Sequence, residues 1–349
     1  MRILVISSYP PRACGVGAYA EGQVERLRAE GHDVTVISPL DGRGDIRMSF
    51  DVGRPLRVAA RRGGQFERII VHFQPGIYYR PRIRAVVSRV RTSLALLLLV
   101  RRRPQTEILI HEAEPRIWWH PSHVVVRRAF ARASLLFHTD AERSALEGDY
   151  RVGVRARLVD HREGVVVRNP QARQEARRRL GIPSTEALFL CAGFLHPKKG
   201  YERAVQAFEE AGAPGQLVIV GSVRDTTPQN LSYTIDLRSL AERTDGVTLI
   251  EAFLSDDDFN TWLAAADHVV LPYTGAWSSG VLARASVIGT PAIISAVGGL
   301  AEQAGPRDEV FHSDEELRRI FRRHGNFSSP ATGRPRAAPL PSTPPSASS

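Results

Sequence analysis

Short apolar runs alternate along this chain with longer stretches in which apolar residues recur every three or four positions. Runs of this kind predict strands at 2–7, 33–38, 68–73, 107–111 and 134–138, and the intervening periodicity predicts helices at 19–30, 82–100 and 124–133. Because the runs are continuously apolar, we expect the strands to be buried on both faces, as in parallel sheets.

The same alternation begins again after about residue 165. Strands are predicted at 187–192, 216–220, 247–250, 268–271 and 291–295, and helices at 204–211, 237–242, 257–266 and 280–287. Repeated βα units predict an α/β protein with two Rossmann-like doubly wound parallel-sheet domains facing a cleft. The predicted domains are residues 1–165 and 166–323. The Pro-, Ser- and Ala-rich stretch 324–349 is expected to be a disordered tail.

The net charge of +10 is placed unevenly. Residues 1–165 carry a large excess of arginine over acidic residues, whereas the rest of the chain is close to neutral. Such asymmetry indicates an anionic partner: nucleic acid, anionic lipid or a phosphorylated substrate. A GC-rich genome also enriches arginine. We expect no nucleic acid, because no nucleic-acid-binding motif and no aromatics interleaved with the arginines are present.

The compartment and the metal content follow from a few residues. The two cysteines, Cys14 and Cys191, lie far apart, which favours a reducing, cytoplasmic setting.

No apolar run reaches the length of a membrane span. The segment 80–103 mixes arginines with Val and Leu; a peripheral contact with an anionic inner membrane face and an ordinary helix with a buried Leu stripe both remain open. His120 and His123 lack a third ligand, so no metal site is expected.

The chain has 47 basic residues, and its lysines are the adjacent pair Lys198 and Lys199, followed by Gly200. A compact ammonium beside a glycine, where the backbone can approach a ligand, suits a phosphate. The loop 193–200 that holds this pair follows one predicted strand. The loops 7–17 and 273–282 follow two others and lead small residues into helix N-termini, where backbone N–H groups favour anions.

Taken in order, these motifs resemble glycosyltransferase family 4, also called glycosyltransferase group 1, whose members have the GT-B fold. The segments that carry the resemblance are Pro10-Pro11 with Cys14-Gly15-Val16, Gly31-His32-Asp33-Val34, Gly193-Phe194-Leu195 with Lys199-Gly200 and Ala207-Phe208, Val218-Ile219-Val220-Gly221, Leu271-Pro272, Gly289-Thr290-Pro291 and Gly298-Gly299. The similarity runs from residue 1 to about residue 323.

The resemblance implies a retaining, metal-independent glycosyltransferase. It would move a sugar from a UDP- or GDP-sugar, its substrate, to a glycan, lipid-linked or phosphorylated acceptor, in glycan, glycolipid or polysaccharide biosynthesis, with no further cofactor. Its N-terminal domain would bind the acceptor and its C-terminal domain the nucleotide sugar. The implied catalytic residues are His111 and Lys199, and the implied donor-binding residues are Gly15, Lys198, Lys199, Phe253, Leu254, Ser278, Ser279, Gly280 and Val281.

The chain departs from the family pattern around the third loop. The family usually has two glutamates there, one for the sugar and one for the ribose, yet no acid lies between Asp267 and Glu302. Depending on the anchor used, the two positions hold Ala276 and Arg284 or Trp277 and Ala285, and Phe194 replaces the family's arginine. A catalytically impaired protein that binds a nucleotide sugar or a partner is therefore the alternative.

Three further histidines, His72, His138 and His161, follow or approach predicted strands. We expect them to pack or to line the cleft rather than to catalyse. The stretch 313–323 is expected to be the final helix or its beginning.

Overall fold

The computed structural model describes the whole chain except residues 13, 80–84, 113–120, 224–226 and 326–349. The chain divides into two compact units. The first holds Met1–Val166 together with Trp277–Gly280, and the second holds Val167–Ala276 and the chain from Val281 onward.

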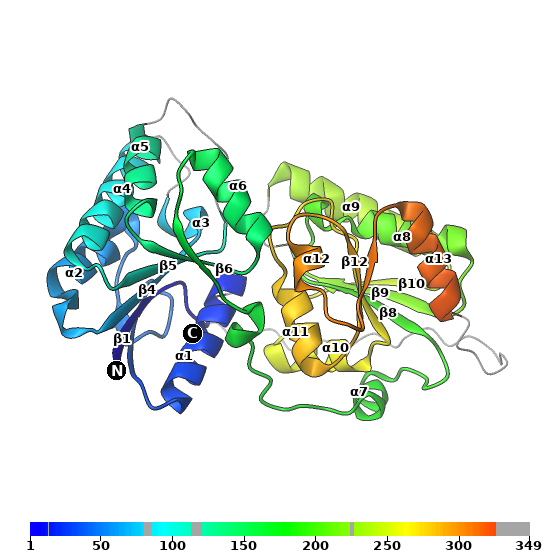
Figure 1. Cartoon of the computed structure of the whole chain (residues 1–349). Coiled ribbons are helices and arrows are strands. Elements are labelled where there is room, and N and C mark those ends of the chain that lie inside the picture. The colour runs from blue at the N-terminus through cyan, green and yellow to red at the C-terminus, as the bar shows by residue number, and fades with distance from the viewer. Residues whose placement is uncertain (13, 80–84, 113–120, 224–226, 326–349) are drawn as a thin grey trace. The chain divides into compact units, whose positions relative to one another are not determined.

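The first unit is built on a parallel sheet of order β3-β2-β1-β4-β5-β6-β7 (Figure 1). Its strands are β1 (Arg2–Ile6), β2 (Asp33–Ser38), β3 (Ile46–Arg47), β4 (Arg68–Phe73), β5 (Thr106–Ile110), β6 (Ser134–Phe137) and β7 (Arg155–Leu158). Strands are added toward one edge of the sheet from β1 to β3 and toward the other edge from β4 to β7, so the strand order reverses between β1 and β4. In such sheets a ligand site forms near this switch point, beyond the carboxyl ends of the strands.

Helices cover both faces of this sheet. They are α1 (Gly15–Ala29), α2 (Arg54–Arg62), α3 (Pro75–Tyr78), α4 (Ala85–Arg102), α5 (Pro121–Phe130) and α6 (Asp140–Tyr150), with 3₁₀ turns η1 (Asp51–Gly53), η2 (Gly63–Gln65) and η3 (His161–Gly164). Alternate residues of β1 face opposite cores. Ile3 and Val5 pack in a cluster with α1, whereas Leu4 and Ile6 pack in a cluster with α2, α4 and α5. The continuous apolar run of this strand is thus explained by burial on both sides.

The second unit repeats the plan with a parallel sheet of order β10-β9-β8-β11-β12-β13. Its strands are β8 (Leu188–Ala192), β9 (Gln216–Gly221), β10 (Val247–Glu251), β11 (His268–Leu271), β12 (Ala292–Ser295) and β13 (Glu309–Phe311). Its helices are α7 (Arg173–Leu180), α8 (Tyr201–Ala211), α9 (Pro228–Arg243), α10 (Asp256–Ala265), α11 (Gly280–Ile288), α12 (Leu300–Gln303) and α13 (Asp314–Gly325), with a 3₁₀ turn η4 (Pro197–Lys199). Here the switch point lies between β8 and β11.

The predicted fold class, two Rossmann-like parallel-sheet α/β domains, is confirmed. The sequence patterns did not predict the edge strands β3, β7 and β13 or the helices α2, α3, α6, α7 and α12, and α9 is far longer than the predicted 237–242. The start of α9 carries a local signal, because the Thr227 hydroxyl accepts a hydrogen bond from the Asn230 N–H and Pro228 occupies the first helical position. The last helix, α13, ends at Gly325, two residues into the stretch predicted to be a tail.

Within the described residues, no helix combines the length and the apolar character that crossing a bilayer requires.

Candidate functional site

Four histidines gather at the carboxyl edge of the first unit's sheet. His72 lies in β4, His111 directly follows β5, His138 directly follows β6, and His161 begins η3 after β7. These strands are parallel and adjacent, so their carboxyl ends bring the four side chains together. Adjacent rings in the series are 5.1 Å (72 to 111), 5.8 Å (111 to 138) and 3.9 Å (138 to 161) apart between centroids.

Helix α1 adds an aromatic ring to this group. The Tyr19 ring lies 5.2 to 5.8 Å from each of the four imidazoles, measured between centroids. The Tyr19 hydroxyl is buried and has no hydrogen-bond partner among the described residues. A Cβ at Gly164 would lie 2.2 Å from the Tyr19 ring, so this position accepts only glycine while the ring stays in place. Together, Tyr19 and the four imidazoles form what we call the histidine cluster.

A chain of hydrogen bonds links α1 to the histidine of β4 and then to the histidine after β5. The Oε1 atom of Gln23, four residues after Tyr19 in α1, lies 3.1 Å from Nε2 of His72. The other ring nitrogen of His72, Nδ1, lies 3.0 Å from Nε2 of His111. Gln23 and His72 are both buried, whereas the side chain of His111 is only partly buried.

The outer pair of the cluster is stacked. The rings of His138 and His161 are 14° from parallel, and Nδ1 of His138 donates a hydrogen bond to the Val159 carbonyl at 3.2 Å. A carbonyl oxygen can only accept, so His138 carries its proton on Nδ1. Its Nε2 atom is buried without a partner among the described residues.

All four imidazoles are held uncharged. Burial is the main cause, because it penalises the charged form. Repulsion from neighbouring imidazoles adds to it at His72, His111 and His161, whereas at His138 the Val159 carbonyl and Asp160 act in the opposite direction. The pKa of His72 falls to about 3 and that of His138 to about 4, and the pKa values of His111 and His161 fall well below the usual value. At neutral pH, each ring therefore has one donor nitrogen and one acceptor nitrogen.

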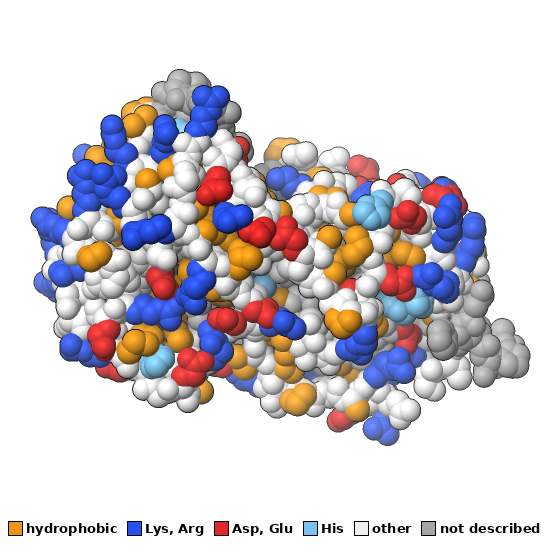
Figure 2. Space-filling view, in the orientation of Figure 1, with side chains coloured by type: hydrophobic (Ala, Val, Ile, Leu, Met, Phe, Trp, Pro, Cys, Tyr) orange, Lys and Arg blue, Asp and Glu red, His pale blue; other side chains and the backbone are white. Residues whose placement is uncertain are grey.

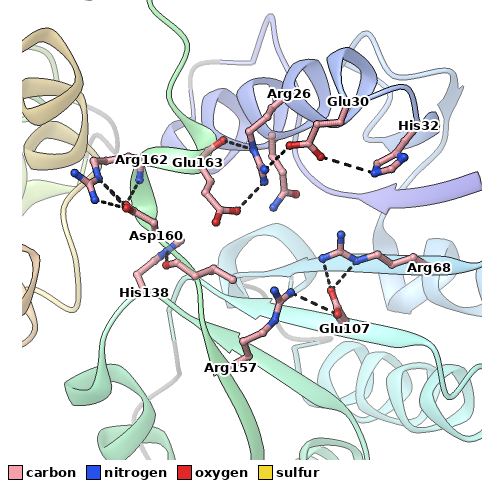
Figure 3. A network of polar contacts seen from close by, with 12 residues as sticks. Arg26, Glu30, His32, Arg68, Glu107, His138, Arg157, Asp160, Arg162 and Glu163 are labelled. Atoms are coloured by element: carbon pink, nitrogen blue, oxygen red, sulfur yellow. Dashed lines mark hydrogen bonds and ion pairs between the residues drawn. The ribbon is translucent and has the colours of Figure 1, made fainter. Parts of the chain in front are cut away.

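Ion pairs hold η3 against α1 at the rim of the cluster, as Figure 3 shows. The Arg26 guanidinium of α1 donates to the Glu163 carboxylate at 2.7 Å and to the Glu163 carbonyl at 3.3 Å. Asp160 accepts from the backbone N–H of Arg162 at 2.9 Å and so caps η3. The arginine beside Asp160 lowers the pKa of this carboxyl group. The turn that presents His161 is therefore fixed to the helix that presents Tyr19.

The predicted site residues of the first unit lie at this same edge. Gly15 is the first residue of α1, and a Cβ added there would meet no heavy atom within 4 Å. The first turn of α1 holds no acidic residue. The first N–H groups of α1 therefore form a helix N-terminus beyond β1 at which an anion can bind, as expected from the sequence.

In the second unit, the lysine pair lies in η4, directly after the loop that follows β8. The side chain of Lys198 is exposed and that of Lys199 is partly buried. The Nζ atom of Lys199 lies 3.8 Å from the centre of the Tyr273 ring, in the loop after β11. A second link between these loops is the hydrogen bond from the Thr274 N–H to the Lys198 carbonyl, at 3.0 Å. Both loops flank the switch point of this sheet, where ligands bind in open α/β sheets.

The backbone conformation and the surroundings of residue 200 explain why a glycine follows the lysines. Its φ is +59°, a conformation that disfavours other residues, and a Cβ there would lie 2.3 Å from the Pro272 carbonyl oxygen. The Arg203 guanidinium donates to the same oxygen at 3.0 Å and to the Tyr273 carbonyl at 3.3 Å. The Ser295 hydroxyl also donates to the Tyr273 carbonyl, at 2.8 Å. Side-chain donors from α8 and β12 thus bind the backbone carbonyls of 272 and 273 and hold this loop beside the lysine turn.

The remaining predicted donor residues lie on two other loops. Ser278 and Ser279 precede α11, which begins at Gly280, and Ser279 is buried while Val281 is partly buried. Of the pair after β10, Phe253 is 63% exposed, whereas Leu254 packs against the core of the unit. Phe253 therefore offers an exposed ring to a ligand, whereas Leu254 offers only part of its side chain.

Arg284, at one of the positions where the family usually has a glutamate, is engaged within the fold. Its guanidinium donates to the Asp256 carboxylate at 2.9 Å and lies 5.5 Å from the centre of the Phe259 ring. This side chain is 16% exposed. An arginine cannot accept a hydrogen bond from ribose hydroxyls, and this one already has an internal partner.

Sequence reasoning missed Gln23 and Tyr19 as parts of a site. Their i, i+4 spacing on a helix predicts a shared face, but only the order of the strands shows that this face meets the histidines. Within the described residues, no group of three or more His, Cys, Asp or Glu side chains is arranged to hold a metal ion. His120 lies outside the described residues.

Comparisons with known proteins agree with this architecture. Residues 172–318 match the family model described as "Glycosyl transferases group 1". A D-inositol 3-phosphate glycosyltransferase from Xylanimonas cellulosilytica is 33% identical over 131 residues, 37% of this chain and 30% of that protein. The curated relatives are matched over 30% to 39% of their own lengths.

Solved structures with low sequence identity share the fold over nearly the whole chain. Sucrose-phosphate synthase from Thermosynechococcus elongatus has a TM-score of 0.65 at 18% identity, covering 94% of this chain and 92% of its own. HepE from Anabaena in complex with UDP-glucose has a TM-score of 0.64 at 15% identity, with the same coverage.

Proposed function

We propose that this chain, a group 1 glycosyltransferase of the GT-B fold class, is a retaining enzyme that transfers a sugar from a UDP- or GDP-sugar to a phosphorylated or lipid-linked acceptor. One observation carries the proposal: Lys199 lies at the switch point of the second sheet, over the Tyr273 ring. Neither lysine of the pair forms an ion pair within the described part of the chain.

The proposed mechanism follows from charge. When the bond between sugar and nucleotide breaks, negative charge grows on the diphosphate leaving group. A preorganised ammonium and backbone N–H groups stabilise that charge in the transition state more than in the ground state. We assign this role to Lys199, with Lys198, Gly15 and the N–H groups of 278–281 as further phosphate contacts. His111 would contact the transferred sugar, and Phe253 with Leu254 would line the nucleobase.

A phosphorylated acceptor is supported by the names of the relatives and by the charge of the first unit. The matched relatives are D-inositol 3-phosphate glycosyltransferases. Helix α4 packs against both α2 and α5, and the three helices carry exposed arginines; Figure 2 shows basic side chains gathered over this part of the unit. These arginines are Arg54, Arg61, Arg62, Arg91, Arg101, Arg102, Arg127 and Arg128. Such a surface attracts an anionic acceptor or an anionic membrane that carries a lipid-linked one.

A two-step experiment tests the donor and the reaction. Thermal unfolding is first followed with UDP, GDP and ADP, since a ligand that binds only the folded state raises its stability. The stabilising nucleotide then selects a sugar donor, and nucleotide release is measured with inositol 3-phosphate as acceptor. Stabilisation and acceptor-dependent release support the proposal. If none of the three nucleotides shifts the midpoint, the donor assignment is wrong.

The second candidate is a protein that binds a nucleotide sugar without transferring it. The Arg284–Asp256 ion pair favours it, because a family glutamate position is occupied by an internal contact. Stabilisation by a nucleotide sugar, with no nucleotide release for any acceptor and for water, would identify this function.

A vesicle experiment tests the membrane contact. Sedimentation with vesicles of phosphatidylcholine alone is compared with vesicles that also contain anionic phosphatidylglycerol. Salt-sensitive sedimentation with the anionic vesicles supports the contact. Equal behaviour with both vesicle types contradicts it.

A further inference from the structure

The hydrogen bonds from Gln23 to His72 and from His72 to His111 determine where each ring carries its proton. The carboxamide oxygen of Gln23 can only accept, so Nε2 of His72 donates to it. Burial holds His72 uncharged, with a pKa of about 3, so this ring has a single proton and its Nδ1 is an acceptor. His111 must then donate from Nε2 across the 3.0 Å contact.

The same logic leaves His111 with an unprotonated Nδ1. Its pKa is lowered well below the usual value, mainly by burial and then by the neighbouring imidazoles, so the ring does not gain a second proton near neutral pH. Among the described residues, the groups that face it are His72, His138, His161 and the Tyr19 ring, all uncharged at that pH. The side chain is only partly buried, and the rings of Tyr19 and His138 lie 5.3 and 5.8 Å from its own ring, measured between centroids.

We propose that Gln23 and His72 are positioning residues that keep His111 in the uncharged Nε2–H form, so that its Nδ1 accepts a hydrogen bond from a hydroxyl of the bound sugar substrate. This inference rests on the proposed glycosyltransferase function for the identity of the ligand. The tautomer itself is a property of the free protein. A ring fixed in this form recognises a hydroxyl as donor and cannot protonate a leaving group.

With the Gln23 carboxamide oriented so that Oε1 faces His72, the matching of donors and acceptors favours this arrangement over the reverse. If His72 carried its proton on Nδ1, its Nε2 lone pair would face the Gln23 oxygen, leaving two acceptors opposed in a buried site. Buried polar groups pay a desolvation cost when they lack a partner. Gln23 is 4% exposed and His72 is fully buried, so water does not relieve that conflict.

The direct test is ¹⁵N NMR of the full chain with labelled histidine rings at pH 7.5, assigned with His72→Asn and His111→Asn. We expect the Nε2–H tautomer at both rings. In Gln23→Leu, we expect His72 to lose its tautomer preference, and in Gln23→Glu, whose carboxylate also accepts, to retain it. An Nδ1–H tautomer or an imidazolium at His111 in the wild type overturns the inference, as does an unchanged His72 in Gln23→Leu.

Kinetics supply a second readout. We expect Gln23→Leu to lower kcat/KM for transfer by about tenfold, the size expected for one lost hydrogen bond, and Gln23→Glu to restore it to within about twofold. Thr92→Val is the matched control, because its buried hydroxyl has no partner among the described residues and lies in α4. Equal losses in the Leu and Glu variants would contradict the positioning role. If the wild type shows no transfer, the proposed function fails, while NMR still decides the tautomer.

Discussion

The ammonium of Lys199 lies 3.8 Å from the centre of the Tyr273 ring, which joins the turn before α8 to the loop after β11. A cation over an aromatic face is oriented by the ring's quadrupole but keeps its full charge. The contact therefore holds the lysine in place and leaves the charge available to an anionic ligand.

Removing this ammonium should abolish transfer without unfolding the protein. We expect Lys199→Ala to lower kcat by about 100- to 1,000-fold, the range found when one group that stabilises developing negative charge is lost. Lys198→Ala should cost only a few-fold, because the Lys198 side chain is exposed. Nucleotide release and melting temperature are measured for both variants. Equal effects of the two substitutions would remove the special role of Lys199.

Two glycines at opposite ends of α8 provide a matched pair for stability. Gly200→Ala should cost more than about 3 kcal/mol, because the new Cβ meets the Pro272 carbonyl oxygen at 2.3 Å in addition to the strain of a φ of +59°. Gly212→Ala should cost about 1 kcal/mol, since its φ is +55° but no heavy atom lies within 4 Å. Urea unfolding measures both. A similar loss in the two variants would mean that the Pro272 contact is unimportant.

The histidine cluster should make stability depend on pH. In the unfolded chain a histidine has a pKa near 6.5, whereas folding lowers the pKa of His138 to about 4. Above pH 6.5 this histidine is neutral in both the folded and the unfolded state, so it does not reduce the stability of the folded protein. As the pH falls from 6.5 toward 4, the unfolded state binds a proton that the folded state refuses, so stability falls, by about 3 kcal/mol for this residue.

Urea unfolding at pH 7.5, 5.5 and 4.5 measures this dependence. His138→Asn keeps a side-chain N–H for the Val159 carbonyl but does not titrate, so its stability should fall less steeply. Wild-type stability that stays constant from pH 7.5 to 4.5 would show that the cluster is already charged or open to water.

Arg284 should matter for stability rather than for donor recognition. Arg284→Met removes the ion pair to Asp256, which is half exposed, so the loss should be no more than about 1 kcal/mol. Arg284→Glu places like charges together and should cost more. In both variants, KM for the donor should stay within about twofold of the wild type. A tenfold rise in KM for Arg284→Met would show that this arginine binds the donor.

The sequence was sufficient for the central strands of both sheets and for the lysine turn, but not for the edge strands β3, β7 and β13. The runs of β2, β4 and β11 have the predicted bounds, because the buried positions of these strands are mostly apolar. The pair Lys198 and Lys199 was found from composition alone. Polar helices such as α6 were missed, because capping and tertiary contacts stabilise them rather than an apolar stripe.

What only the tertiary structure decided is which side chains meet. His72 and His111 are 39 residues apart, and Gln23 is 49 residues from His72, yet they form one hydrogen-bonded chain because β1, β4 and β5 are neighbours in the sheet. Strand order is set by the joint packing of all strands and helices, so no local sequence pattern encodes it. The uncharged state of the histidines likewise arises from burial, which exists only after the sheet and its helices have assembled.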